Sequence, residues 1–213
     1  MNNNYFLNKT IIITGANQGI GLEIAKNFYF KGSNIILCAR NKKKLLSIKK
    51  KLVSNFNNKF FLECLDISNK NQVDKFYKKI FKKNKQINIL INNAGIYGPK
   101  GPSETLKWNE WKNTLDINLL GSIYMINKII PHFKKRKNGK IIQISGGGAS
   151  SAFPFFSPYS VSKVGVVRFI ENISIELKKY NIYANSIAPG PVNTRMLAQV
   201  LRAGPKKVGK NFY

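Results

Sequence analysis

A tyrosine and a lysine lie four residues apart in the segment YSVSK, as Tyr159 and Lys163. In a helix this spacing puts both side chains on one face. A phenol with a pKa of about 10 is a poor base at neutral pH, but a nearby ammonium group favours the phenolate and lowers that pKa. The pair could therefore move a proton to or from a substrate oxygen. The same spacing is also common in pairs that only face solvent, so the chemistry needs support from other motifs.

A glycine-rich turn, TGANQGIG, occupies residues 14–21 between a strand-like apolar run and a helical pattern. Gly15, Gly19 and Gly21 allow close approach of a ligand to the backbone, and the start of the helix offers N–H groups and the positive end of its dipole. These features suit a pyrophosphate. The spacing is G-x-x-x-G-x-G, so it is the strand-turn-helix context that favours nucleotide binding over a purely structural turn.

Polar residues follow the next two strand-like runs. A ribose 2′-hydroxyl group would call for an acidic residue about 20 residues after the glycines, but the chain has Ala39 and then Arg40. The guanidinium group of Arg40 can pair with a 2′-phosphate, which favours NADP over NAD, or it can simply be solvated in a basic protein. Asp66 could accept a hydrogen bond from an adenine amine; it could also cap the next helix, as could Ser68.

The motifs lie on a regular alternation of strand and helix patterns. This alternation predicts an α/β fold with a doubly wound parallel sheet, organised as one domain over residues 1–213. Right-handed crossovers then bring the loops that follow the strands to one edge, where ligands usually bind. The predicted strands are 9–14, 34–39, 59–65, 87–92, 139–145 and 182–188, and the predicted helices are 19–31, 41–54, 70–83, 108–135 and 158–180.

The composition is strongly basic, with 36 lysines and arginines against 9 acidic residues and a net charge of +27. Such a charge can attract nucleic acid. The lysines of 41–52 and 76–86, however, alternate with apolar residues at helical spacing, which indicates solvated helix faces and no specific nucleic-acid partner. The chain has no apolar run of about 18 residues and no signal-peptide pattern, so we expect a cytoplasmic protein without membrane insertion.

Two cysteines, Cys38 and Cys64, lie in strand-like runs and are predicted to be buried free thiols. Cysteine and histidine residues show no metal-ligand spacing. We therefore expect no metal site.

Six motifs together resemble the short-chain dehydrogenase/reductase family: TGANQGIG, LD (65–66), NNAG (92–95), LDINLLG around Asn118, YSVSK and PGPVNT (189–194). They occur in the family's order over nearly the whole chain. The resemblance implies a Rossmann-type sheet of six strands in the order 3-2-1-4-5-6 with helices on both faces. It implies reversible hydride transfer between NAD(P), with NADPH favoured and NAD possible, and a small carbonyl or alcohol substrate. It also implies a homodimer formed through the helices 108–135 and 158–180.

The resemblance assigns roles to single residues. Tyr159 would be the general acid/base, and Lys163 would bind the nicotinamide ribose and lower the pKa of Tyr159. Asn118 would hold a water molecule that links Lys163 to solvent. In addition to Arg40, the positions expected to bind the cofactor are Gly15, Asn17, Gln18, Gly19, Ile20, Gly21, Asp66, Ile67, Asn92, Ala94, Gly95, Lys163, Pro189, Gly190, Val192 and Thr194.

The chain departs from the family pattern at the serine that polarises the substrate carbonyl. That serine most often precedes the tyrosine by thirteen residues, which is the position of Gly146, whereas Ser145 lies one residue earlier. Either the glycine run absorbs an extra residue and Ser145 is catalytic, or Gly146 holds the position and the hydroxyl group is missing. A second departure is Gln18, where NADP-dependent members often have a basic residue, so the preference for NADP rests mainly on Arg40.

The third departure is at the C-terminal end. Family members usually continue with a helix and a seventh strand, and without them the strand 182–188 becomes a sheet edge. An alternative reading is therefore a truncated, catalytically weak or silent nucleotide-binding scaffold. Residues 97–103, 146–157 and 193–213 are interpreted as loops that shape the substrate pocket.

Overall fold

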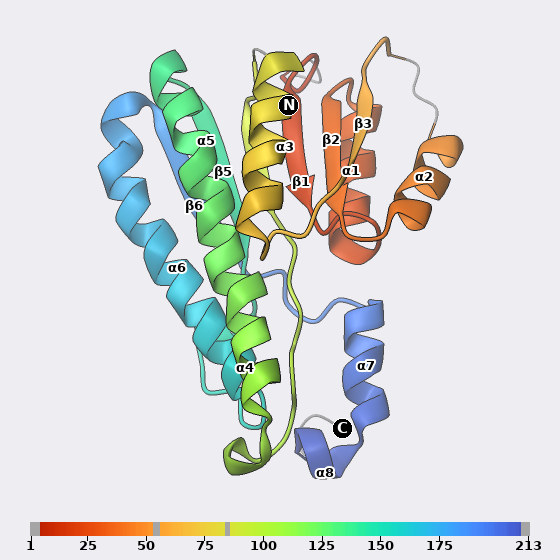
Figure 1. Cartoon of the computed structure of the whole chain (residues 1–213), viewed down its shortest axis with the longest axis vertical. Coiled ribbons are helices and arrows are strands. Elements are labelled where there is room, and N and C mark those ends of the chain that lie inside the picture. Colours follow the sequence, from red (N-terminus) through yellow and green to blue (C-terminus); the bar gives the residue numbers. More distant parts are fainter. Residues whose placement is uncertain (1–4, 53–55, 84–85, 210–213) are drawn as a thin grey trace.

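A computed structural model of the chain describes residues 5–52, 56–83 and 86–209, and its central feature is a parallel β-sheet. The strands are β1 (Thr10–Thr14), β2 (Asn34–Ala39), β3 (Phe60–Cys64), β4 (Ile89–Asn92), β5 (Gly139–Ile144) and β6 (Ile182–Ile187). They lie in the order β3-β2-β1-β4-β5-β6, which confirms the predicted topology (Figure 1). Because the order reverses between β1 and β4, the loops that follow these strands diverge at the carboxyl edge of the sheet.

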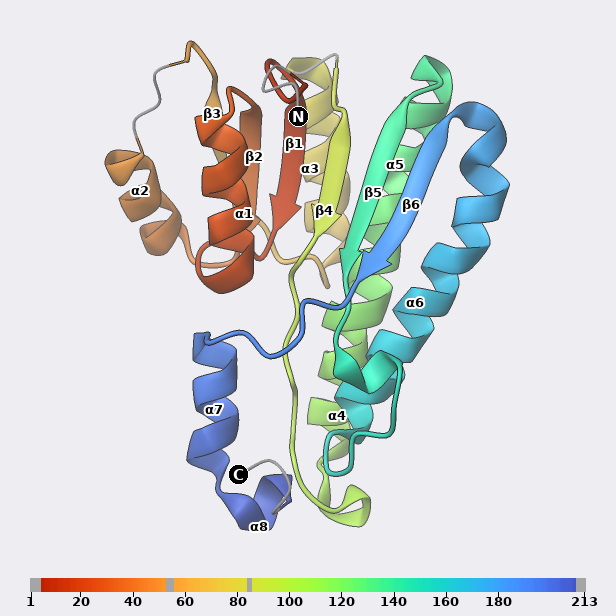
Figure 2. The same ribbon diagram turned by 180° about the vertical axis from the view of Figure 1, so that it is seen from behind.

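Helices cover both faces of the sheet. On one face lie α1 (Gly19–Phe30) and α2 (Lys42–Lys51), and on the other lie α3 (Lys70–Lys83), α5 (Ser122–Arg136) and α6 (Ser157–Leu177), as Figures 1 and 2 show from opposite sides. These elements agree with the predicted helices to within a few residues at their ends.

The isoleucine-rich strands supply two hydrophobic cores, because successive strand residues point to opposite faces. In β1, Ile12 belongs to the core under α3, α5 and α6, whereas Ile11 and Ile13 belong to the core under α1 and α2; all three are fully buried. The charged faces of the helices point outward: Lys43 and Lys79 are exposed. This confirms that these lysine-rich segments form solvated helix faces.

The helix predicted over 108–135 contains a change of helix type. It begins as α4 (Trp108–Leu115), continues as a π-helical turn, η2 (Asp116–Gly121), and becomes α5. Single π-helical turns inside α-helices occur frequently at functional sites. Asn118, one of the predicted catalytic residues, lies in this turn.

The prediction of a loop over 193–213 is wrong for most of its length. The chain forms α7 (Arg195–Ala203) and α8 (Pro205–Val208) beyond the carboxyl edge of the sheet (Figures 1 and 2). The Thr194 hydroxyl group caps α7 by accepting from the Leu197 backbone N–H at 3.5 Å. A threonine followed by apolar residues at helical spacing is a helix signal that the sequence contained. The last four residues of that range lie outside the described part of the chain.

Strand β6 forms one edge of the sheet, as predicted for 182–188. Tyr183 and Ile187 on its outer face are 52% and 47% exposed. An edge strand with exposed apolar side chains can pair with another chain.

The cysteines differ in exposure. Cys38 is a buried free thiol, as predicted, but Cys64 is exposed. The prediction for Cys64 is wrong because this residue ends β3, which is the other edge strand of the sheet. Among the described residues, no helix combines the length and the apolar composition that a membrane span requires.

Candidate active site and cofactor cavity

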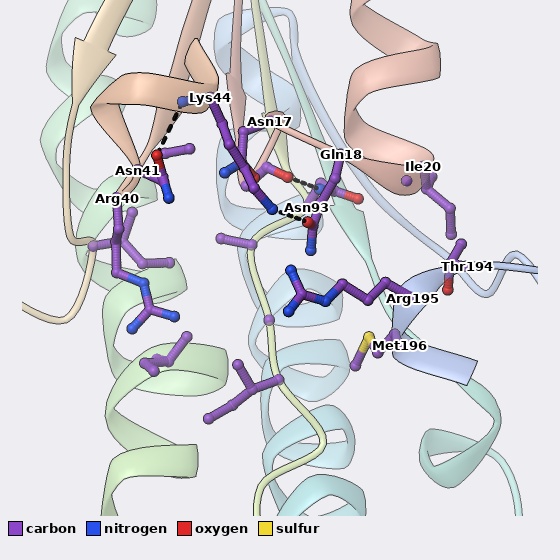
Figure 3. Close-up of a pocket in the computed structure, with 18 of the residues that line it drawn as sticks. Asn17, Gln18, Ile20, Arg40, Asn41, Lys44, Asn93, Thr194, Arg195 and Met196 are labelled. Carbon is purple, nitrogen blue, oxygen red and sulfur yellow. Dashed lines mark hydrogen bonds between the residues drawn. The ribbon is translucent and has the colours of Figure 1, made fainter. Parts of the chain in front are cut away.

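A cavity of about 450 Å³ opens at the carboxyl edge of the sheet, between the glycine-rich turn and the start of α7 (Figure 3). This volume is in the range of small-molecule sites. The predicted cofactor-binding residues that line it are Gly15, Asn17, Gln18, Gly19, Ile20, Arg40, Asp66, Ile67, Ala94, Gly95 and Thr194.

The three glycines of the turn have different roles. Gly15 has a φ of 63°, and a Cβ atom there would lie 2.6 Å from the Cα atom of Ala94. A Cβ atom on Gly21 would overlap the side-chain amide of Asn93. These two glycines therefore let the turn pack against the loop that follows β4, and Gly21 is buried behind the cavity wall. Gly19, with a φ of 56°, lines the cavity, and a Cβ atom there would lie in ordinary van der Waals contact with Thr194, 3.5 Å from its methyl carbon.

The first turn of α1 has backbone donors that no side chain caps. Gln18 is the N-cap residue, but its side chain makes no capping hydrogen bond. Its Oε1 atom instead accepts from the Nζ atom of Lys44 at 3.2 Å. The first N–H groups of a helix have no partner within the helix and carry the positive end of its dipole. This end of α1 therefore suits a phosphate group.

Cationic side chains outnumber carboxylates three to one in the lining. Arg40 follows β2, Lys44 lies in the first turn of α2, and Arg195 begins α7, whereas Asp66 is the one acidic residue. Such a wall attracts an anionic ligand. Sequence reasoning identified Arg40 but missed Lys44 and Arg195, because only the fold brings them to the same cavity.

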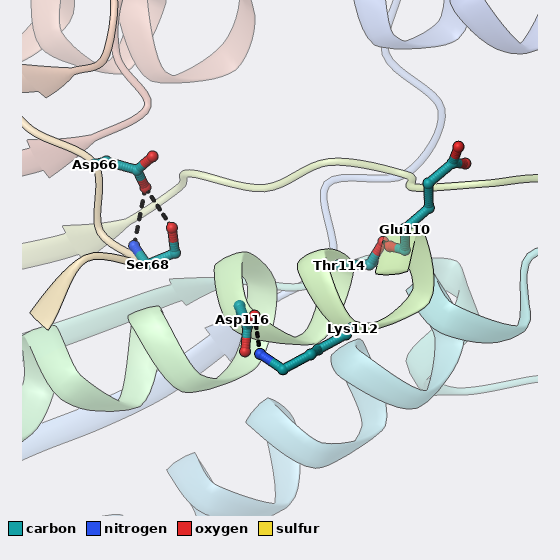
Figure 4. Close-up of polar contacts among 6 residues, drawn as sticks. All are labelled: Asp66, Ser68, Glu110, Lys112, Thr114 and Asp116. Atoms are coloured by element: carbon teal, nitrogen blue, oxygen red, sulfur yellow. Dashed lines mark hydrogen bonds and ion pairs between the residues drawn. The ribbon is translucent and has the colours of Figure 1, made fainter. Parts of the chain in front are cut away.

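Asp66 holds its own loop at the cavity wall. Its Oδ1 atom accepts from the backbone N–H of Ser68 at 3.0 Å and from the Ser68 hydroxyl group at 2.7 Å (Figure 4). Neither residue caps α3, because Asn69 does so. The nearby Asp116 forms an ion pair of 2.7 Å with Lys112. No group of three or more His, Cys, Asp or Glu residues among those described could hold a metal ion.

Asn92 does not lie where a contact with ribose was expected. Its side chain is buried, and Nδ2 donates to the carbonyl oxygen of Ser122 at 2.9 Å. As the last residue of β4 it points toward α5, away from the cavity. The next residue, Asn93, lines the cavity, and its Nδ2 atom donates to the carbonyl oxygens of Thr14 at 3.0 Å and Gly15 at 3.2 Å. Asn93 was missed because the motif alone does not show which asparagine faces inward.

The segment between β6 and α7 contributes less to the cavity than expected. Pro189, Gly190 and Val192 are exposed and are not among the lining residues. Thr194 does line the cavity, and Met196 and Gln199 of α7 extend this wall.

The predicted catalytic residues lie together behind the cavity floor. Tyr159 and Lys163 lie one turn apart on α6 and are 6% and 3% exposed. A Cβ atom on Gly95 would lie 3.5 Å from the Nζ atom of Lys163 and 3.2 Å from the Oδ1 atom of Asn118. Because Gly95 lines the cavity, its missing side chain leaves the lysine and the asparagine directly beneath the surface.

Hydrogen bonds fix the side chains of Lys163 and Asn118. The Nζ atom of Lys163 donates to the carbonyl oxygen of Ile144 at 2.9 Å. Asn118 bonds twice to the backbone of Ile96, accepting from its N–H and donating to its carbonyl oxygen, both at 2.8 Å, and it also donates to the Ser162 hydroxyl group at 3.0 Å. Asn118 therefore braces the loop after β4, a role that sequence reasoning did not assign to it.

The pKa of Tyr159 moves in the direction opposite to the one expected. Burial raises the pKa of this phenol, and the neighbouring Tyr97 raises it further. Burial also lowers the pKa of Lys163, to about 8. The Nζ atom of Lys163 lies 5.6 Å from the centre of the Tyr159 ring. Desolvation of the phenolate is therefore the main cause of the shift, and Tyr159 is protonated at neutral pH.

Gly146 lies against the hydroxyl group of Tyr159, since a Cβ atom at position 146 would overlap that group. Ser145 continues the ladder between β5 and β6, with its N–H donating to the carbonyl oxygen of Ile187 at 2.8 Å. The Ser145 hydroxyl group is buried and has no hydrogen-bond partner in the described part of the chain. This geometry favours the register in which position 146 faces the tyrosine and carries no hydroxyl group.

Aromatic and aliphatic side chains cover the Tyr159 ring. The ring of Tyr97 lies 4.8 Å away, centre to centre. Phe156 belongs to the same buried cluster, together with Val200 of α7 and Val208 of α8. The two unpredicted helices thus both contribute to the cluster around Tyr159, and α7 also lines the cavity.

The sequence of this chain is similar to those of known proteins. The sequence pattern of the short chain dehydrogenase family matches residues 9–204. The fatty acyl-CoA reductase of Acinetobacter baylyi is 32% identical over 89% of this chain and 64% of its own length. The 3-ketodihydrosphingosine reductase of Mus musculus is 31% identical over 92% of this chain and 60% of its own length.

Solved structures show the same architecture. A variant of actinorhodin polyketide ketoreductase with NADPH superposes with a TM-score of 0.87 at 27% identity, over 93% of this chain and 76% of that one. Levodione reductase superposes with a TM-score of 0.89 at 25% identity, over 97% and 82%. The chain belongs to the short chain dehydrogenase family. It spans 64% and 60% of the length of the two relatives named by sequence.

Proposed function

We propose that this protein is an NAD(P)-dependent oxidoreductase that transfers a hydride between a nicotinamide cofactor and a small carbonyl or alcohol. The observation that carries the proposal is the buried pair Tyr159 and Lys163, which lies directly behind the floor of a cation-lined cavity. The uncapped start of α1 forms the phosphate-binding wall of the same cavity. Several relatives have names of reductases, and the ketoreductase structure contains NADPH.

NADPH is the favoured cofactor. Arg40 lines the cavity just after β2, where a guanidinium group can form two parallel hydrogen bonds with a 2′-phosphate. Lys44 adds a second positive charge from the first turn of α2. An acidic residue that would repel the 2′-phosphate and accept from a ribose hydroxyl group is missing at this position, since Ala39 precedes Arg40.

The residues of this chain supply orientation and a proton, and the nicotinamide supplies the hydride. Tyr159 is protonated at neutral pH, so it can donate its hydroxyl proton to the oxygen of a carbonyl substrate. Lys163 holds its nitrogen one helical turn away, where a positive charge stabilises the phenolate that the transfer leaves. Asn118 keeps the loop at Ile96 in place and so fixes the floor between the two groups and the cavity.

A second candidate function is a nucleotide-binding scaffold with little or no turnover. Gly146 favours it, because the position that faces the tyrosine hydroxyl group has no side-chain donor to polarise a carbonyl. Loss of a comparable donor in other enzymes costs about 2.7–4 kcal/mol of transition-state stabilisation. The scaffold would keep the cavity and its cations but not the chemistry.

Oxidation of NADPH, followed by absorbance with a panel of ketones, aldehydes and sugars, separates the two candidates. We expect turnover with at least one carbonyl substrate and its loss in Tyr159→Phe, which removes the proton but little volume. Binding of NADPH, measured by fluorescence, should stay the same in that variant. Binding without turnover in the wild type would favour the scaffold. Failure of the wild type to bind NADPH or NADH would contradict both.

A homodimer through α4, α5 and α6 is part of the proposal. Exposed apolar side chains lie on α4 and α6, among them Trp108 of α4 at 74% exposure and Val161 and Val164 of α6 at 49% and 50%. Exposed apolar surface of this kind marks a contact site for another chain. We expect a dimer in light scattering and a shift to monomer in Val164→Glu, while a monomeric wild type at high concentration would contradict it. The cytoplasmic location stays a prediction.

A further inference from the structure

Arg195 is a cation that the proton chemistry does not use. It is the first residue of α7, and its side chain extends from that helix into the cavity, toward the wall that holds Gln18 and Asn93 (Figure 3). In the described part of the chain its guanidinium group has no hydrogen bond and no ion pair. Lys44, in contrast, is bonded to Gln18.

The start of α7 lies beside the start of α1. A Cβ atom on Gly19 would lie 3.5 Å from the methyl carbon of Thr194, the cap of α7. An anion held on the backbone N–H groups of α1 would therefore lie beside the residue that follows Thr194. Arg195 brings to this place five N–H donors in a planar fork, which suits the oxygens of a phosphate.

The position of Arg195 differs from that of Arg40. Arg40 follows β2, on the other side of the cavity from α7 (Figure 3). A bound dinucleotide would place its 2′-phosphate at Arg40 and its diphosphate at the glycine-rich turn. The two arginines would therefore contact different phosphates of the same molecule. The one carboxylate of the lining, Asp66, is bonded within its own loop and is not paired with Arg195.

We propose that Arg195 is a positioning residue that binds the diphosphate of the cofactor and thereby holds α7 over the bound molecule. The proposal rests on the function proposed above, because it assumes a dinucleotide in the cavity. It gives α7 a role beyond covering Tyr159: the cofactor and the helix stabilise each other through one charged contact. Because Val200 and Val208 also pack in the cluster at Tyr159, this contact orders the wall that faces the substrate.

The test compares two fragments of the cofactor. ADP-ribose has the diphosphate but no 2′-phosphate, and 2′-AMP has the 2′-phosphate but no diphosphate. Their dissociation constants are measured by displacement of NADPH from the full chain. We expect Arg195→Ala to raise the dissociation constant of ADP-ribose by about 10- to 100-fold and to leave that of 2′-AMP within about twofold of the wild-type value. The reason is that the variant loses a hydrogen-bonded charge at the diphosphate and none at the 2′-phosphate. Arg40→Ala should give the reverse pattern.

Controls separate the contact from general damage to the helix. Arg202→Ala removes an exposed arginine of the same helix that does not line the cavity, and it should change neither affinity. The affinity of Arg195→Lys for ADP-ribose should lie between those of the wild type and Arg195→Ala, because lysine keeps the positive charge but lacks the planar set of N–H donors. ADP-ribose should also slow tryptic cleavage after Arg202 in the wild type but not in Arg195→Ala.

Three outcomes would overturn the inference. Unchanged affinity for ADP-ribose in Arg195→Ala would show that Arg195 does not bind the diphosphate. Equal weakening of both fragments would show a general loss of structure or charge and not a specific contact. If the wild type bound neither ADP-ribose nor NADPH, the proposed function and this inference would fail together, whereas in the first two outcomes the proposed function stands.

Discussion

The backbone of Gly146 lies directly against the hydroxyl group of Tyr159, and a Cβ atom at position 146 would overlap that hydroxyl group. The phenol oxygen therefore occupies the space in which a side chain of residue 146 would begin. Gly146 lies in the loop that follows β5, and Tyr159 lies in the first turn of α6, so their contact exists only in the folded chain. It determines both the donor set of the site and the room available to the tyrosine.

Gly146→Ala is expected to displace the hydroxyl group of Tyr159. Overpacking of a buried site costs about 1–3 kcal/mol, and we expect kcat to fall by about tenfold or more because a displaced acid loses its alignment with the substrate. Gly147→Ala is the matched control, since a Cβ atom there meets nothing within 4 Å. Steady-state kinetics and thermal unfolding of both variants give the comparison. Equal kcat values and equal unfolding temperatures for the two variants would contradict the contact between Gly146 and the hydroxyl group of Tyr159.

Ser145→Ala should leave turnover within about threefold of the wild type. The Ser145 hydroxyl group is buried without a hydrogen-bond partner among the described residues. Its removal therefore breaks no hydrogen bond and leaves no other buried polar group without a partner. Thermal unfolding should occur at the same temperature or higher. A fall in kcat of about 10²- to 10³-fold would show instead that this hydroxyl group polarises the carbonyl.

The buried lysine predicts a pH dependence of stability. The pKa of Lys163 is about 8 in the folded chain against an ordinary value of 10.5. Between about pH 8 and pH 10 the unfolded chain therefore binds a proton at this residue that the folded chain has released, so the free energy of unfolding rises with pH, by up to about 1.4 kcal/mol per pH unit. Below about pH 8 both states are protonated, and the contribution to the slope disappears.

Urea unfolding of the wild type and of Lys163→Met from pH 7 to pH 10 measures this effect. The stability of the wild type relative to the variant should increase from about pH 8 upward. The comparison ends near pH 10, because unfolded tyrosines begin to ionise there while Tyr159, with its raised pKa, does not. Parallel stability curves for the two proteins would show that Lys163 titrates normally.

Arg40→Ala should change the selectivity between the two cofactors. We expect the dissociation constant of NADPH to rise by about tenfold or more and that of NADH to stay within about threefold, because only NADPH has a 2′-phosphate for the guanidinium group. Lys43→Ala removes an exposed charge from α2 outside the cavity lining and should affect neither cofactor. Equal losses for NADPH and NADH would mean that Arg40 acts only through general attraction of anions.

Much of the site follows from local sequence. The isoleucine-rich runs are apolar on both faces, which is typical of strands that lie between two layers of helices, so the positions of the strands and their parallel arrangement could be predicted. The spacing of Tyr159 and Lys163 predicts that both side chains lie on one face of a helix, and both residues belong to α6. The glycine-rich turn follows β1 and opens α1, and most of its residues line the cavity.

Other features depend on distances between segments that are far apart in the sequence. Which residue faces Tyr159, Ser145 or Gly146, depends on the register of β5 against α6. Asn93 lines the cavity and Asn92 does not, because the last residue of β4 points to the other face of the sheet.

By itself, the sequence determined the strand-helix order, the nucleotide-binding turn and the tyrosine-lysine pair, because these depend on local patterns and on the spacing within one element. Only the tertiary structure decided that α7 brings Arg195 into the cavity and that burial raises the pKa of Tyr159. Desolvation and the meeting of charges from separate elements are properties of packed neighbours, and no single segment of the sequence contains them.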